Sequence, residues 1–308
     1  MSSKMQGGPI HSCAFVLVAA VGLAVGASQA NAALLTTSIV NDTFDTYTSQ
    51  SNFEAMWVPI GTGTPSGAVW SSTQSASSPQ SVQVPGNTTA TASLTQSRNR
   101  ATFAETSTVG TISPATWITF SVDFYDVGRT ASTSPMRNYA NLQDGTAPSG
   151  TNQLVSLGLN NNQISTDSGG NYFMARILGY SPPAADPDGG PGETGTLGSG
   201  AYFKLNDTGV GLRNAAAGWR NLKVVIGTND GASTDYLFYV DGVLAETVSN
   251  VGSAASIRSY ENIVIGSGLS NGNIGAYFDN VSLTVTTPEP ATLIASGALA
   301  AFALIRRR

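Results

Sequence analysis

The stretch Gly218-Trp219-Arg220-Asn221-Leu222-Lys223-Val224-Val225, followed closely by Tyr239-Val240-Asp241-Gly242, decides the fold of this chain. The first run predicts a strand over 219–226. The second predicts a hairpin in which Asp241-Gly242 joins strands at 236–240 and 243–248, because Asp-Gly is favoured in two-residue hairpin turns. Consecutive antiparallel strands are therefore the expected building block of the fold.

Other segments of the chain show the same strand character. The clearest is 116–127, where Trp117, Thr119, Ser121 and Asp123 face one way and the apolar residues between them face the other, as in a half-buried strand. Further strands are expected at 34–47, 81–84, 152–159, 171–178, 263–265 and 277–285. We find no internal repeat and no convincing helix between residues 33 and 287, so the sequence predicts an all-β, antiparallel β-sandwich.

The composition excludes several classes of chemistry. The only His, His11, and the only Cys, Cys13, precede residue 33. The rest of the chain therefore lacks the base of a Ser-His-Asp or Cys-His site, the usual zinc and haem ligands, and any disulfide. Residues 33–287 contain ten Lys and Arg against eighteen Asp and Glu, a net charge of −8, which disfavours nucleic acid as a partner.

Residues 1–32 have the pattern of a secretory signal peptide. Lys4 supplies the positive charge, and 14–27 form an uncharged, mostly apolar segment. Ser28-Gln29-Ala30 or Ala30-Asn31-Ala32 offers a small-residue cleavage site. The secretion machinery is therefore an expected partner, and the protein is expected to be exported.

The C-terminal segment 288–308 has three parts in a fixed order. Pro288-Glu289-Pro290 is followed by the uncharged run 291–305 and by Arg306-Arg307-Arg308. Fifteen helical residues reach about 22 Å, short of the roughly 30 Å of a bilayer core, so the run predicts a marginal transmembrane helix with its arginines in the cytoplasm.

This tail resembles the PEP-CTERM sorting signal of exported bacterial proteins. The resemblance implies an inner-membrane intermediate, removal of the tail by an exosortase, and delivery to the cell surface or extracellular matrix. It divides the chain into a signal peptide (1–32), a β-sandwich domain (33–287) and a sorting signal (288–308). The alternative for the tail is a buried C-terminal helix of the soluble domain.

The stretches from Gly218 and Tyr239 resemble the concanavalin A-like and laminin-G-like jelly rolls, in which a Gly-Trp-led strand precedes a Tyr-Val-Asp-Gly hairpin. Arg220 stands where that family often has His. A second resemblance joins 41–45 and 278–283 to the outer strands of galactose-binding-like modules. Both families are antiparallel sandwiches, and the first match covers more consecutive residues, so a concanavalin A-like jelly roll is the predicted fold.

The galactose-binding-like resemblance implies a structural calcium ion near the terminal strands, held by Asp42 or Asp45 together with Asp279. Calcium prefers oxygen ligands. Asp279 also shares its strand parity with Val281 and Leu283, which predicts a place at the inner edge of the sandwich. The alternative is that Asp279 accepts hydrogen bonds from backbone N–H groups.

A glycan-active enzyme is one candidate function, because glycoside hydrolases share the concanavalin A-like fold. Hydrolysis needs two carboxyl groups facing one cleft, and the Glu-x-Asp-x-Glu strand of laminarinase-type members is absent. Asp123 and Asp126 are three residues apart and so point to opposite faces of a strand. Carboxylates distant in sequence could still converge, but a non-catalytic protein is expected.

Sugar binding would use an aromatic platform. Trp57 and Trp70 lie in Gly/Ser/Thr-rich segments and are the expected exposed candidates, whereas Trp117 and Trp219 open apolar strands and are expected in the core. The sequence thus predicts an exported envelope or matrix protein that binds polysaccharide, with exopolysaccharide as the ligand class implied by the sorting tail. The alternative is a purely structural surface protein without a small ligand.

Overall fold

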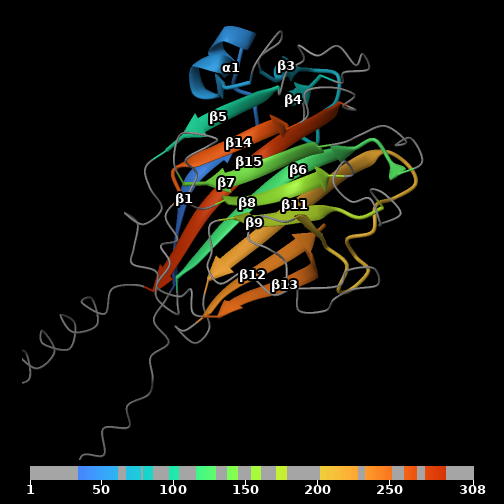
Figure 1. Cartoon of the computed structure of the whole chain (residues 1–308). Helices are drawn as coiled ribbons and strands as arrows, with labels where there is room; N and C mark the ends of the chain where they lie inside the picture. The colour runs from blue at the N-terminus through green and yellow to red at the C-terminus, as the bar shows by residue number, and fades with distance from the viewer. Residues whose placement is uncertain are drawn as a thin grey trace, which may run out of the picture. The chain divides into compact units, whose positions relative to one another are not determined.

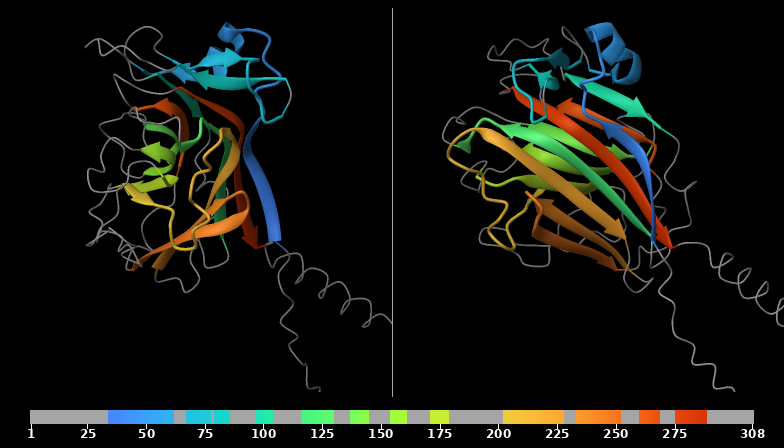
Figure 2. Two further views of the ribbon diagram at one scale, coloured as in Figure 1. Left: turned by 90° about the vertical axis from the view of Figure 1, so that its right-hand side faces the viewer. Right: turned by 180° about the vertical axis from the view of Figure 1, so that it is seen from behind.

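A computed structural model describes residues 34–61, 67–77, 79–85, 97–103, 116–129, 137–144, 154–160, 171–178, 202–227, 233–251, 260–268 and 275–288. Within these residues the chain forms an antiparallel sandwich of two sheets, consistent with the predicted jelly roll (Figures 1 and 2). The predicted signal peptide (1–32), residues 289–308 and the predicted transmembrane run 291–305 lie outside them. No helix among the described residues is long and apolar enough to cross a bilayer.

We call the two layers sheet A and sheet B. Sheet A has the order β13-β12-β11-β6-β15-β4-β3, and β1 also pairs with β15. Its strands are β1 (Leu34–Asp42), β3 (Val69–Ser71), β4 (Ser81–Val84), β6 (Trp117–Asp126), β11 (Gly218–Gly227), β12 (Ser233–Val240), β13 (Val243–Val251) and β15 (Ala276–Pro288).

Sheet B has the order β10-β9-β8-β7-β14-β5-β2. Its strands are β2 (Val58–Pro59), β5 (Arg98–Thr102), β7 (Arg137–Gln143), β8 (Leu154–Asn160), β9 (Met174–Leu178), β10 (Tyr202–Lys204) and β14 (Asn262–Ser267). Segments far apart in sequence therefore lie side by side, as β14 does between β5 and β7 (Figure 1).

The predicted hairpin is confirmed. Asp241 and Gly242 both have positive φ (51° and 80°), as the tight turn between β12 and β13 requires. The Asp241 carboxylate also accepts a hydrogen bond from the Asn221 N–H (2.9 Å) and pairs with Arg220 (2.7 Å), which ties the turn to β11.

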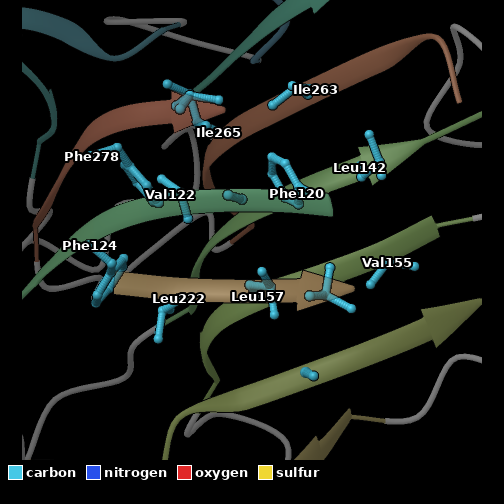
Figure 3. Close-up of a cluster of buried hydrophobic side chains, with 14 of the residues drawn as sticks. Phe120, Val122, Phe124, Leu142, Val155, Leu157, Leu222, Ile263, Ile265 and Phe278 are labelled. Carbon is cyan, nitrogen blue, oxygen red and sulfur yellow. The ribbon is translucent and has the colours of Figure 1, made fainter. Parts of the chain in front are cut away.

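The core lies between the sheets. Phe120, Val122 and Phe124 of β6 point inward from sheet A, and Leu142 and Ile263 point inward from sheet B (Figure 3). All five side chains are buried. The alternation predicted for 116–127 is confirmed, because every second residue of β6 from Ile118 onward is buried.

One helix was not predicted from the sequence. Helix α1 (Gln50–Met56) is only seven residues long, and Ser49 caps its N-terminus by accepting a hydrogen bond from the Asn52 N–H (3.2 Å). Phe53 is its only buried residue, so the helix contributes one apolar side chain to the core and leaves little periodicity for sequence analysis to detect.

The face predicted for Asp279 is wrong in register. A bulge interrupts the pairing of β15 with β6 between Asp279 and Ser282, and Asn280 has φ 47°. The extra residue shifts the alternation. Val281 and Leu283 consequently point into the core, whereas Asp279 belongs to the outward set of Tyr277.

Candidate functional site

The outward side of sheet B, which we call the polar face, carries mostly polar side chains together with the apolar Leu154, Met174 and Val264. Inward-pointing residues such as Ala140, Leu157 and Ile265 belong to the core, so their strand neighbours point outward. The polar outward residues of the described strands are Arg98, Arg100, Thr102, Arg137, Tyr139, Asn141, Gln143, Ser156, Asn160, Arg176, Tyr202, Lys204 and Asn262.

Strand register places these residues in rows across the sheet. One row runs from Arg100 through Val264, Asn141 and Ser156 to Arg176 and then Tyr202. The adjacent row runs from Arg98 through Gly266, Tyr139, Gly158 and Met174 to Lys204. Each row thus has a basic residue on β5 and another on β9 or β10, with uncharged residues between them.

The middle of the polar face is buried although its side chains are polar. Asn141, Ser156 and Asn262 are all at most 5% exposed. The Ser156 hydroxyl donates to Asn141 Oδ1, and the Thr102 hydroxyl donates to Asn262 Oδ1 (2.8 Å). Buried polar groups of this kind need hydrogen-bond partners, so the middle of the face is a fixed network of amides and hydroxyls.

Tyr202 lies at the centre of a basic cluster. The guanidinium carbons of Arg176 and Arg137 are 5.1 and 5.7 Å from the centroid of its ring. Such stacking holds planar guanidinium groups in place. Lys204, two residues further on, is 3% exposed, and burial lowers the pKa of its ammonium group.

Tyr139 is buried on the same face, at 6% exposure. Glycines flank it on both neighbouring strands, with Gly266 on β14 and Gly158 on β8. Both glycines have positive φ, and a Cβ atom there would lie about 2 Å from a neighbouring backbone oxygen. Burial raises the pKa of the Tyr139 hydroxyl, which is hydrogen-bonded to Arg98. The two glycines leave room on the strands beside the ring, whereas Arg98, Arg137 and Tyr202 lie around its hydroxyl.

The expected exposure of Trp57 is wrong. Trp57 is 1% exposed, its indole N–H donates to Asp42 Oδ2 (2.8 Å), and its ring packs against those of Phe44 and Phe53. Trp70 is half-buried on the edge of the core, and its indole N–H donates to the Phe44 carbonyl (3.1 Å). Trp57 has no open ring face to offer a sugar.

The other two tryptophans are also placed differently from expectation. Trp117 and Trp219 lie half-buried on the outward side of sheet A and not in the core. Trp219 contacts Tyr125, which in turn contacts Tyr277, with ring centroids 5.4 and 5.7 Å apart. The ring of Trp117 covers Gly227. Both residues therefore shield the outer side of the sheet.

The expected calcium ligands are held by hydrogen bonds. Asp279 accepts from the backbone N–H groups of Ala76 (2.8 Å), Ser77 (3.0 Å) and Asn280 (2.7 Å), which is the alternative that the sequence left open. Burial raises the pKa of Asp279, and the nearby charge of Asp45 adds to that rise.

Asp42 lies in a different environment. Its carboxylate accepts from the Tyr47 hydroxyl (2.5 Å), the Trp57 indole and the Phe44 N–H (2.8 Å). Asp45 accepts from the Gln80 N–H (2.9 Å). Among the described residues, no three His, Cys, Asp or Glu side chains come together in a way that would hold a metal ion.

The strand carboxylates point apart, as expected. Asp126 is buried and pairs with Arg213, whereas Asp123 lies outside and accepts from Asn221 (2.8 Å) and Asn280 (2.7 Å). The described strands of sheet B contain no Asp or Glu. The pair of facing carboxyl groups that glycoside hydrolysis requires is thus not formed by the described strand residues of the polar face.

Sequence analysis missed the polar face because it missed three of the strands that build it. β5, β7 and β10 carry the sequences RNRAT, RNYANLQ and YFK, which have too few apolar residues to show a core-facing pattern. The available signal was alternation of basic and polar residues with small or apolar ones, as in Arg100-Ala101-Thr102.

No protein-family model matches this chain, and no curated protein sequence does. Several solved structures resemble it in fold. An endo-β-1,4-glucuronan lyase from the fungus Trichoderma reesei is 11% identical, with 82% of this chain and 96% of that chain covered and a TM-score of 0.45.

An alginate lyase from Chlorella virus is 14% identical (80% and 99% covered, TM-score 0.45), and the carbohydrate recognition domain of Emp46p is 10% identical (82% and 95% covered, TM-score 0.41). The likeness is weak and concerns overall architecture, so it assigns neither an activity nor a ligand to this chain.

Proposed function

We propose that this protein is a non-catalytic, exported envelope or matrix protein that binds polysaccharide on the polar face of sheet B. The observation that carries the proposal is the row across this face in which the half-buried Arg100, Arg176 and Tyr202 flank the buried amide and hydroxyl of Asn141 and Ser156. Sugars are recognised by such planar arrays of hydrogen-bonding groups beside aromatic rings. The export and sorting parts of the proposal rest on the N- and C-terminal sequence patterns, with an exosortase and the inner membrane as transient partners.

The positions of the described carboxylates favour binding of the polysaccharide without its cleavage. Asp126 is engaged with Arg213, and Asp123, on the outward side of sheet A, accepts hydrogen bonds from two asparagines of the same sheet. A folded surface protein that binds no glycan is the principal alternative. The two differ in a single measurable property, which is retention of the folded chain by polysaccharide.

The test uses the full chain and two matched tyrosines. Tyr202 lies on the polar face under two arginines, whereas Tyr239 lies on the outward side of sheet A with the Lys223 ammonium 4.3 Å from its ring centroid. Affinity electrophoresis through gels containing neutral and acidic polysaccharides would be run on Tyr202→Ala, Tyr239→Ala and Trp70→Ala.

We expect Tyr202→Ala to lose at least about tenfold in affinity, as removal of a central aromatic contact does at other interfaces, while Tyr239→Ala binds as the parent does. A loss confined to Trp70→Ala would place the site at the edge of sheet A. If the parent chain shows a cooperative thermal transition but is retained by no polysaccharide, the structural alternative is correct.

A further inference from the structure

The two sheets divide the charged residues between them. The strands of sheet A contain six acidic residues and two basic ones, whereas the strands of sheet B contain five basic residues and no acidic one. The segment 33–287 as a whole has ten basic residues and a net charge of −8. Half of the basic residues of an acidic segment are thus gathered on one sheet.

All five basic residues of sheet B point outward onto the polar face. Their neighbours along the strands, among them Ala101, Ala175 and Phe203, belong to the core. Since successive strand residues alternate between faces, Arg100, Arg176 and the other three share the opposite side. The charge is therefore concentrated on one surface and does not surround the sandwich.

Four of the five basic residues occupy the two sides of the polar face, and Arg137 lies between them on β7. Arg98 and Arg100 lie on β5, and Arg176 and Lys204 lie on β9 and β10. Five strand spacings separate β5 from β10, which corresponds to about 24 Å. A flexible chain with several charges can span this width, whereas one small anion cannot contact both sides.

Burial has already removed part of the hydration of these cations. Lys204 is 3% exposed, and all four arginines are half-buried. The Nε–H of Arg98 is buried with no hydrogen-bond partner among the described residues. A partly desolvated guanidinium group interacts strongly with a carboxylate, which it contacts through two parallel hydrogen bonds.

We propose that the ligand of the polar face is an acidic polysaccharide whose sugar units carry carboxylates, that is, a polyuronate. Arg98 and Arg100 on one side and Arg176 on the other, all half-buried, bind its carboxylates, while the half-buried Tyr202 contacts its sugar rings. This inference rests on the proposed polysaccharide binding and adds the chemical class of the ligand. Among the residues that the structure describes next to the strands of this face, Asp144 follows β7 and Glu261 precedes β14.

The experiment compares probes that differ only in charge. Polygalacturonate, hyaluronate and alginate would each be presented to the full chain in the ionised, unesterified form and as the methyl ester, which keeps the sugar backbone and removes the charge. We expect the best-binding ionised polysaccharide to bind at least about tenfold more tightly than its ester, and its affinity to fall at least about tenfold between low and high salt.

Three variants separate charge from structure. Arg176→Gln should lose most of the preference for the acid, whereas Arg176→Lys keeps the charge and should retain part of it. Lys223→Gln, on the outward side of sheet A, removes one positive charge elsewhere and should change nothing. Thermal melts of the three variants show whether each is folded.

The outcomes distinguish this inference from the function on which it rests. Equal binding of acid and ester, or binding of neutral polysaccharides only, overturns the polyuronate assignment and leaves polysaccharide binding intact. Equal binding of dextran sulfate or single-stranded DNA overturns the assignment to carboxylates. If no polysaccharide binds, the proposed function fails together with the inference.

Discussion

On sheet A, β6 alternates regularly between buried and half-buried residues, whereas on sheet B, β8 and β14 are buried along their whole length. The outward residues of β6 are those expected of a strand with one side toward water. The outward residues of β8 and β14 include Ser156, Asn160 and Asn262, which are polar and yet buried.

Burying polar side chains on sheet B lowers the stability of the folded state, and an antiparallel sandwich does not by itself require it. Polar side chains in water need no fixed partner, but buried ones must be hydrogen-bonded or they destabilise the folded state. A sheet face that buries amides and gathers basic residues is less stable than an apolar one of the same shape. This pattern is the one expected if the polar face binds the proposed ligand, whereas the outward side of sheet A has the pattern of an ordinary protein surface.

The largest effect on the free energy of unfolding is expected from removing one member of a buried ion pair. Arg213 and Asp126 are each at most 2% exposed and are joined by two hydrogen bonds, from Nε (3.0 Å) and Nη2 (2.5 Å). Removing one partner leaves the other charge buried, so Arg213→Met should lower the free energy of unfolding by about 3–5 kcal/mol. Urea denaturation measures this.

The matched variant is Arg176→Gln on the polar face, where the arginine is half-buried. Its unfolding free energy should change by less than about 1 kcal/mol. Comparable destabilisation by the two substitutions would mean that the arginines of the polar face are structural, which would weaken the case for binding.

A second effect depends on pH. Burial, followed by the neighbouring Asp207, raises the pKa of Glu246 in β13 to about 9 from 4.5. The folded chain thus keeps a proton that the unfolded chain releases. The stabilisation is complete below about pH 4.5 and is lost as the pH rises toward 9. The melting temperature should fall over this range.

Glu246→Gln removes this titration, so the melting temperature of the variant should change less with pH between about 5 and about 9. Glu54→Gln, on helix α1, is the control and should leave the slope as it is in the parent. An unchanged slope in Glu246→Gln would show that Glu246 is ionised in the folded chain at neutral pH.

The smallest effect is expected from removing a single polar side chain on each of the two sheets. Asn262 on the polar face is fully buried and accepts a hydrogen bond from Thr102 (2.8 Å), whereas Thr119 on sheet A is half-buried and points outward. Asn262→Ala should cost about 1–3 kcal/mol, and Thr119→Ala should stay within about 0.5 kcal/mol. Equal costs in denaturant titrations would contradict the distinction between the two faces.

Sequence analysis predicted sheet A well. Its central strands β6, β11 and β12 contain alternating or continuous apolar runs, and Asp241-Gly242 supplies a turn with a local conformational requirement. Hydrophobic periodicity and turn chemistry are local properties, so they can be detected from neighbouring residues alone. The same local rules could not detect the bulge at Asn280, which depends on pairing with a strand more than 150 residues earlier.

The candidate site could not be assembled from sequence. Trp57 and Trp70 were expected to be exposed because they lie in polar segments, but Asp42 and the nearby aromatic rings bury the first and the core edge holds the second. The basic residues of β5, β7 and β10 appeared as scattered charges, because the strands that carry them lack an apolar pattern.

The sequence by itself determined the all-β class, the hairpin, the absence of His and Cys after residue 32, and the terminal patterns that predict export and sorting. Only the tertiary structure decided that Arg98, Arg100, Arg137, Arg176 and Lys204 share one face. The physical reason is that strand pairing between distant segments brings these residues together, and pairing is determined by the packing of the whole sandwich and not by the residues beside each one.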